Sequence, residues 1–202
     1  MIHKGNQKRI YFEGARYFVT FNTSNRITYF SEPLLCEVFI LSLYLSKFFY
    51  NYDLYAFVIL LDHGHILFLP HKSQDLSKVM RYIKRHTARN INFVLGYSSE
   101  EEIGQSLLRL GDKYCKRKTE IENYNKKLVK LRQKFVIKYG LKNNIYPKFS
   151  WQRSFLDHYI RNDKDFDQHI SYIYNNPFKH DILNSEKYQY IFTNYPDLIT
   201  QF

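Results

Sequence analysis

The chain has 202 residues, of which 45% are apolar and 18% aromatic, so it is long and apolar enough for one sizeable core. Its 30 basic and 19 acidic residues give a net charge of +11, which favours an anionic partner, nucleic acid before a membrane surface. Two distant cysteines, Cys36 and Cys115, exclude a disulfide scaffold and a cysteine-rich zinc site. The first residues do not resemble a signal peptide, so the expected setting is a reducing cytoplasm, close to the nucleoid.

The first part of the chain predicts a strand followed by a helix. Residues 16–22 are rich in β-branched and aromatic side chains, which favour a strand. Residues 33–49 form an apolar run that Glu37 and Lys47 interrupt. This interruption favours a buried amphipathic helix over a membrane span.

A predicted hairpin and a second helix follow. Residues 55–61 and 63–69 are apolar runs that predict two strands joined by a tight turn. Beyond them, apolar residues recur at helical spacing, so a helix is expected to begin at Asp75 or Ser77 and to run to about Asn92. The order strand, helix, strand, strand, helix lacks only one strand of a ferredoxin-like α+β unit.

A basic segment lies between the second helix and the remaining strand. Residues 98–140 have a helical pattern, and five apolar residues in their second half recur at alternating steps of three and four. This stripe is too short for a coiled coil and favours a helical hairpin packed on the domain. We therefore expect one domain built from residues 1–95 and 150–202, with 96–149 as a basic helical insertion. The excess of lysine and arginine in the insertion favours a nucleic-acid contact over mere solvation.

The end of the chain completes the predicted fold. Residues 155–160 are expected to supply the last strand, and Asn162 or Asp163 is expected to cap a final helix. Pro177 is expected to end or kink that helix. The predicted fold is an α+β, ferredoxin-like antiparallel sheet with helices on one face, plus a separate C-terminal helix and the helical insertion.

Two histidines, His63 and His65, lie one residue apart within the apolar strand predicted for 63–69. Side chains alternate along a strand, so both imidazoles are expected on the same face. Burying them is costly unless hydrogen bonds or a metal ion satisfy their nitrogens. A His-x-His tripeptide is a weak motif, and by itself it favours a hydrogen-bonded structural pair over a metal site.

The predicted final helix has one apolar and one polar face. His169, Tyr172 and Asn176 share the polar face at positions i, i+3 and i+7. Tyr172 and Asn176 are one turn apart, so their side chains can contact the same object. Taken alone, this pattern is typical of an amphipathic helix whose polar face is solvated.

Together, two segments resemble a known family. DHGHILF (residues 62–68) and WQRSFLDHYIRNDKDFDQHISYIYNNPFKHDIL (residues 151–183) resemble the single-tyrosine transposases of the HUH endonuclease superfamily, and among them the REP-associated tyrosine transposases. Members of this family show a His-x-His strand, a Trp-Gln element and a helix reading Tyr-Ile-x-x-Asn-Pro. The resemblance covers roughly residues 10–95 and 150–185. It departs at Leu61, where family members usually have proline, and in the length of the insertion.

The resemblance implies a role for each matching residue. Tyr172 would be the nucleophile, which makes the final helix the catalytic helix, and His63, His65 and Asn176 would bind Mg²⁺ or Mn²⁺. Attack of the tyrosine hydroxyl on a phosphodiester would leave a 5′-phosphotyrosine and a free 3′-hydroxyl, and a 3′-hydroxyl could later reverse the step. Tyr174 is two residues further on and points in a different direction from the same helix.

Basic residues on the helix after the histidine strand, with two residues of the Trp-Gln element, are the predicted DNA contacts. A solvated helix face explains the helix residues equally well. The predicted contacts are Lys78, Arg81, Lys84, Arg85, Arg89, Trp151 and Arg153.

The lead hypothesis is a metal-dependent transposase that cleaves and joins single-stranded or hairpin DNA, with a homodimer as a possible assembly and no membrane partner. The resemblance, not the composition, implies the hairpin. The alternative is a domesticated, non-catalytic protein that binds hairpin nucleic acid. An RNA-processing phosphoesterase is disfavoured, because it would need a second histidine motif and His158 and His169 do not repeat the pattern of the first.

Overall fold

The computed structural model describes residues 11–71, 75–99, 101, 118–141, 145–180 and 188–200. Four antiparallel strands form one sheet in the order β2-β3-β1-β4, which confirms the predicted α+β class. The strands are β1 (Tyr17–Asn22), β2 (Tyr52–Leu60), β3 (His63–Pro70) and β4 (Leu156–Tyr159). The α-helices are α1 (Pro33–Tyr50), α2 (Leu76–Val94), α4 (Lys118–Tyr139) and α5 (Asp163–Lys179). Short 3₁₀ helices are η1 (Ser24–Arg26), η2 (Tyr29–Ser31), η5 (Phe192–Asn194) and η6 (Pro196–Leu198).

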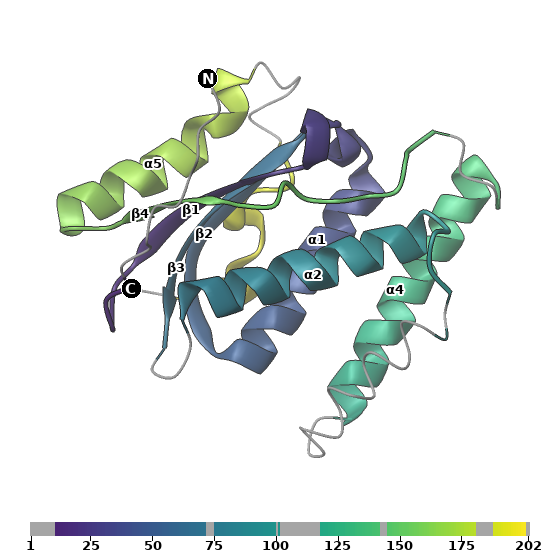
Figure 1. Ribbon diagram of the computed structural model, residues 1–202, viewed down its shortest axis with the longest axis horizontal. Coiled ribbons are helices and arrows are strands. Elements are labelled where there is room, and N and C mark those ends of the chain that lie inside the picture. Colours follow the sequence, from purple (N-terminus) through teal and green to yellow (C-terminus); the bar gives the residue numbers. More distant parts are fainter. Residues whose placement is uncertain are drawn as a thin grey trace.

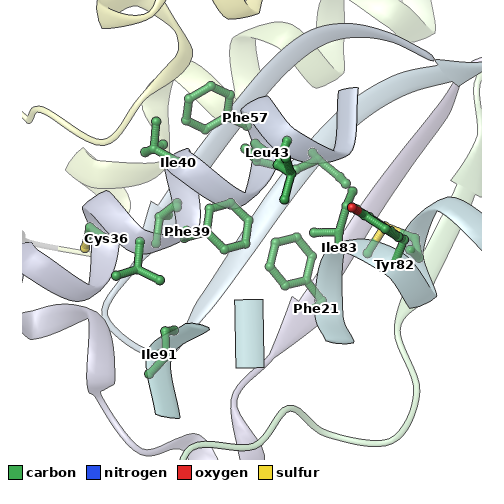
Figure 2. Packing of buried hydrophobic residues seen from close by; sticks show 14 of the residues in the cluster. Phe21, Cys36, Phe39, Ile40, Leu43, Phe57, Tyr82, Ile83 and Ile91 are labelled. Carbon is green, nitrogen blue, oxygen red and sulfur yellow. The ribbon is translucent and has the colours of Figure 1, made fainter. Parts of the chain in front are cut away.

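The two faces of the sheet carry different helices. Figure 1 shows α1 and α2 on one side of the strands and α5 on the other. In Figure 2, Phe21 and Phe57 of the sheet lie in one cluster with Phe39 of α1 and Ile83 of α2. The neighbouring residue on β2, Val58, belongs instead to the smaller cluster that α5 covers. Because side chains alternate along a strand, the odd-numbered residues of β3 face α5.

Helix α1 is long and apolar enough to pass a test for membrane spans, yet it is a core helix here. It packs against α2 and α4, and 56% of its residues are buried inside the protein. Leu35 and Leu43 are completely buried in the larger core. This packing supports the interpretation as a buried helix.

The predicted apolar stripe of the insertion is part of the main core. Its five residues are buried where α4 packs on α1 and α2: Ile121, Tyr124, Leu128, Leu131 and Phe135. The predicted helix over 98–140 is described from Lys118 onward, and its part over 102–117 lies outside the described residues, as does Cys115.

Helix α5 begins as predicted but does not end as predicted. The side chain of Asn162 accepts a hydrogen bond of 2.9 Å from the Asp165 amide, which caps the first turn. Pro177 does not end the helix, because α5 continues for two more residues to Lys179. Pro177 lies in the last turn, where it removes one backbone donor, while the His180 amide still donates to the Asn176 carbonyl over 3.3 Å.

The C-terminal segment covers the exposed edge of β2. Ile191 forms a bridge with Val58, and the Ile59 amide donates to the Tyr190 carbonyl over 3.1 Å. Further along, the Thr200 amide donates to the Leu54 carbonyl over 2.8 Å. These bonds use backbone groups that an open edge strand would leave available to another chain.

The glycine between the two histidines is required by packing. Gly64 faces the larger core, where a Cβ atom would lie 2.7 Å from Cζ of Phe21. We expect Gly64→Ala to lower the free energy of unfolding by about 1–3 kcal/mol, because the Phe21 ring has little room to move in the core. Urea denaturation measures this change. The double variant Gly64→Ala and Phe21→Leu should lose less stability than the sum of the losses in the two single variants, because the smaller side chain relieves the clash. A loss equal to that sum would contradict the proposed clash.

Candidate active site

His63 and His65 lie on the face of β3 that α5 covers, and both are buried. Their ring centroids are 5.2 Å apart. The Tyr172 ring of α5 lies 5.3 Å from the His65 ring, and the His180 ring lies 5.1 Å from the His63 ring. The structure therefore brings the predicted nucleophile to the histidine pair within a single chain.

Asn176 lies on the same stripe of α5. Tyr172, Asn176 and His180 are spaced by four residues, so they lie one above the other along the helix. Tyr172 contacts one histidine and His180 contacts the other, and this pair of contacts brackets Asn176. Its side chain is completely buried, and neither Oδ1 nor Nδ2 has a hydrogen-bond partner among the described residues. A buried amide without partners costs free energy, which makes Asn176 a candidate ligand for a bound group.

Each histidine of the pair is oriented through its Nδ1 atom. The Nδ1 atom of His63 lies 2.6 Å from a carboxylate oxygen of Asp62, which Arg26 holds at 2.8 Å. The Nδ1 atom of His65 lies 2.8 Å from the Thr20 hydroxyl. The Nε2 atom of His65 remains buried with no partner in the described part of the chain. This pattern is typical of metal-binding histidines, whose second nitrogen is held by a carboxylate or another polar group.

Burial favours the neutral form of both rings. Burial lowers the pKa of His65 to about 3, and the positive charges that His63, His180 and Arg26 can carry add to this effect. Burial also lowers the pKa of His63, although the Asp62 carboxylate opposes it. A neutral imidazole offers a lone pair, so these shifts favour metal binding over protonation.

The lowered pKa of His65 predicts a loss of stability in acid. In the unfolded chain this imidazole takes up a proton near its ordinary pKa of 6.5, whereas in the folded chain it does so only near 3. Stability is therefore fully present above pH 6.5 and falls as the pH is lowered toward 3. Urea denaturation between pH 7 and pH 4 measures the slope, which should become shallower in His65→Gln. It should not vanish, because burial also lowers the pKa of His86 to about 3. An unchanged slope in His65→Gln would contradict this account.

The donor atoms fit the divalent cation that the sequence resemblance implies. β3 offers two imidazoles and α5 offers the amide of Asn176, and the described residues leave Nε2 of His65 and Oδ1 of Asn176 unsatisfied. A cation would supply the partner that these buried atoms lack.

Tyr172 lies at the border between this buried site and solvent. It is 37% exposed, and the Lys179 ammonium lies 4.5 Å from the centroid of its ring. An open groove of about 750 Å³ runs along the outer face of α5 beside it, lined by Tyr172, Lys179 and Ser171 among others. A substrate can therefore reach the tyrosine from outside while the histidines remain covered.

The structure gathers five of the seven predicted DNA contacts around a second groove, of about 430 Å³. It lies between α2 and the segment 151–155, and the predicted contacts that line it are Arg81, Lys84, Arg85, Trp151 and Arg153. Lys84 positions the segment, since its ammonium donates to the carbonyls of Gln152 and Ser154 over 2.7 and 3.0 Å.

The other two predicted DNA contacts lie elsewhere. Lys78 is exposed on α2 but does not line the groove. Arg89 points into the packing between helices, where its guanidinium lies 2.7 Å from Nδ1 of His86. Trp151 lines the groove with only part of its ring, since Phe21 and Phe149 pack against its faces and edges.

The sequence did not indicate every residue of the site. His180 lies four residues after Asn176, so the helical spacing could have identified it. Thr20 pairs with His65 across two strands that are 45 residues apart in sequence, and no local pattern signals that pairing. Phe18 was also missed, although its ring stacks on His65 at 5.3 Å and contacts Tyr172 at 5.7 Å.

Comparisons with known proteins agree with these observations. The family model for IS200-like transposases matches residues 12–111. A candidate REP-associated tyrosine transposase of Haemophilus influenzae is 26% identical over 176 residues, which are 87% of this chain and 77% of that protein. The REP-associated tyrosine transposase of Escherichia coli K12 is 37% identical over 59 residues, which are 29% of this chain and 32% of that protein.

A solved structure shares the fold. It is a REP-associated tyrosine transposase bound to a REP hairpin, with a TM-score of 0.56 and 23% sequence identity. The match covers 92% of this chain and 80% of the other. At this identity the likeness establishes the arrangement of the sheet and helices.

Proposed function

Because this chain belongs to the IS200-like transposases and is of the REP-associated tyrosine type, we propose that it cuts and rejoins single-stranded DNA beside a hairpin. Tyr172 is the proposed nucleophile, and His63, His65 and Asn176 are the proposed ligands of Mg²⁺ or Mn²⁺. The observation that carries the proposal is the contact of the Tyr172 ring with His65, near buried donor atoms that have no partner among the described residues.

In the proposed reaction the Tyr172 hydroxyl loses its proton to water, and its oxygen forms a bond to the phosphorus of one phosphodiester. The bond from phosphorus to the 3′ oxygen breaks, and that oxygen leaves as a 3′-hydroxyl after taking up a proton. The other strand end stays attached to Tyr172 through a 5′-phosphotyrosine, which keeps the energy of the broken bond for rejoining. A bound divalent cation supplies neutralisation of charge on the phosphate.

Residues around Tyr172 support this chemistry. The Lys179 ammonium lies over the ring of Tyr172, where its positive charge attracts an approaching phosphate. Phe18 packs against both Tyr172 and His65, so it fixes the ring of the nucleophile relative to the ligands. All of these residues belong to one chain, so the proposed site needs no second subunit.

The basic groove is the proposed contact for the DNA backbone. Arg81, Arg85 and Arg153 suit phosphate oxygens, and Phe155 offers a ring on which an unpaired base can stack. The solved relative of this fold is bound to a hairpin, which supports a hairpin as the substrate here.

Removing charge from the groove should weaken DNA binding. We expect Arg81→Ala combined with Arg85→Ala to raise the dissociation constant about tenfold or more, and to reduce the salt dependence by about one per lost phosphate contact. Fluorescence anisotropy with a hairpin oligonucleotide at several salt concentrations measures both quantities. Lys78→Ala is the matched control, because Lys78 lies on the same helix but outside the groove. Equal losses in the two variants would count against a specific contact in the groove.

The proposed activity is tested with labelled single-stranded oligonucleotides that carry the inverted repeats flanking the gene. With Mg²⁺ or Mn²⁺ the protein should produce a shortened strand and a protein–DNA species that survives denaturation. Salt-sensitive binding of the hairpin without cleavage and without metal dependence would overturn the catalytic proposal and favour the non-catalytic binding protein.

A further inference from the structure

A second group of metal-binding side chains lies outside the candidate active site. His158 on β4 and Asp165 and His169 on α5 each offer one ligand atom, and these atoms lie within 4.8 Å of one another. Two imidazoles and one carboxylate are a common protein ligand set for Zn²⁺ and related divalent transition metals. The group shares no residue with the pair on β3, and the function proposed above does not use it.

The distances within this group match a shared ion. Oδ1 of Asp165 lies 3.3 Å from Nε2 of His158 and 3.2 Å from Nδ1 of His169. Ligands about 2.0–2.1 Å from a tetrahedral metal ion are separated by about 3.3 Å from each other. The two distances from the carboxylate oxygen to the nitrogens therefore match two edges of such a site, and the two nitrogens lie within 4.8 Å of each other.

The other oxygen of the carboxylate is held by neighbouring groups. Oδ2 of Asp165 accepts a hydrogen bond of 3.0 Å from the Arg161 amide and a longer one from the Arg161 guanidinium. These bonds orient the carboxylate and keep it ionised, as groups behind a metal ligand do. Burial would raise the pKa of Asp165, but the hydrogen bonds from Arg161 and His158 hold it well below its usual range.

Exposure and orientation also suit entry of an ion. The Asp165 side chain is buried, whereas those of His158 and His169 are 39% and 20% exposed. The two imidazoles stack with their centroids 4.8 Å apart, and both flank the same carboxylate. The outer side of the group is therefore open to water, which can complete the coordination.

We infer that His158, Asp165 and His169 form a second metal site, which binds Zn²⁺ or a related transition-metal ion and fastens the first turn of α5 to β4. On binding, the proton of each nitrogen that becomes a ligand moves to the other nitrogen of the same ring, or to water if that nitrogen is already protonated. Nε2 of His158 and Nδ1 of His169 then give up their hydrogen bonds to the Asp165 carboxylate and carbonyl. β4 is a four-residue edge strand, so such a link ties the helix that carries Tyr172 to the sheet.

Cobalt provides the test, because Co²⁺ replaces Zn²⁺ at nitrogen and oxygen sites and its absorption reports coordination. The full chain, stripped of metal with a chelator, is titrated with Co²⁺ and then with competing Zn²⁺. We expect two ions per chain in the parent and one in His65→Asn, which retains only the second site. In the His65→Asn background, adding His158→Gln or His169→Gln should weaken the remaining binding at least about tenfold.

His71→Gln is the matched control, because His71 also pairs with a carboxylate, Asp53 at 2.8 Å, but belongs to no group of three metal-binding side chains in the described part of the chain. It should leave binding unchanged. Thermal unfolding with and without Zn²⁺ gives an independent readout: the metal should raise the melting temperature of His65→Asn but not that of its His158→Gln derivative. Binding in His65→Asn that neither His158→Gln nor His169→Gln weakens would overturn the inference. So would the absence of any binding in a folded His65→Asn, since the three residues would then be only a hydrogen-bonded cluster.

Discussion

Tyr172→Phe is expected to abolish DNA cleavage and the covalent protein–DNA species, with a fall in rate of at least about a thousandfold. Phenylalanine keeps the ring contacts with His65 and Phe18 but removes the only atom that can bond to phosphorus. Hairpin binding should stay within about twofold of the parent, because the proposed phosphate contacts lie in the groove beside α2. A denaturing gel of the labelled oligonucleotide after incubation with Mn²⁺ measures cleavage and adduct together.

Tyr174→Phe is the matched control. Tyr174 lies two residues away on the same helix and is 50% exposed, so it also presents a hydroxyl to solvent. About 200° of helix rotation separates the two side chains, and only Tyr172 is in ring contact with the histidine pair. Full activity in Tyr172→Phe together with loss of activity in Tyr174→Phe would show that Tyr174, and not Tyr172, is the nucleophile. An adduct in the Tyr172→Phe variant would refute the role of Tyr172.

The strands and helices were predictable because their signals are local. The two histidines fall on one face of β3 by alternation alone, and Asp75 and Asn162 cap the helices that follow them, as their positions in the sequence indicated. The case of Pro177 is different. A proline in the interior of a helix usually breaks or kinks it, but a proline in the last turn removes only one hydrogen bond. The local sequence does not indicate how many residues follow Pro177 in the helix.

Contacts between segments that are distant in the sequence could not be predicted from local patterns. His158 and His169 showed no recognisable motif, because one lies on a strand and the other on a helix, and only the fold brings both to Asp165. The same limit applies to the C-terminal segment, whose pairing with β2 depends on a backbone edge and not on a side-chain pattern. A nucleophile and ligands could be proposed only through the family resemblance, since the spacing on α5 alone fits an ordinary amphipathic helix.

His65→Asn is expected to reduce cleavage about a hundredfold or more at low Mn²⁺, with hairpin binding nearly unchanged. The substitution removes one imidazole from the proposed ligand set, while Tyr172 keeps its hydroxyl. If the loss arises from weaker metal binding, raising the Mn²⁺ concentration should restore part of the rate, because occupancy then recovers by mass action. A variant that had lost its fold would show no such recovery and would lose hairpin binding as well.

Thr20→Val tests the orientation of the His65 imidazole without removing the imidazole. Valine has a similar shape but cannot hydrogen-bond to Nδ1 of His65, so the imidazole stays while its orientation loosens. We expect metal affinity to fall about 10- to 100-fold, less than in His65→Asn, with the same recovery at high Mn²⁺. We therefore expect apparent metal affinity to be highest in the parent, lower in Thr20→Val and lowest in His65→Asn. This order is expected only if Nε2 of His65 binds the ion. If cleavage by both variants shows the metal dependence of the parent, then His65 is a structural histidine and the cation of the reaction binds elsewhere.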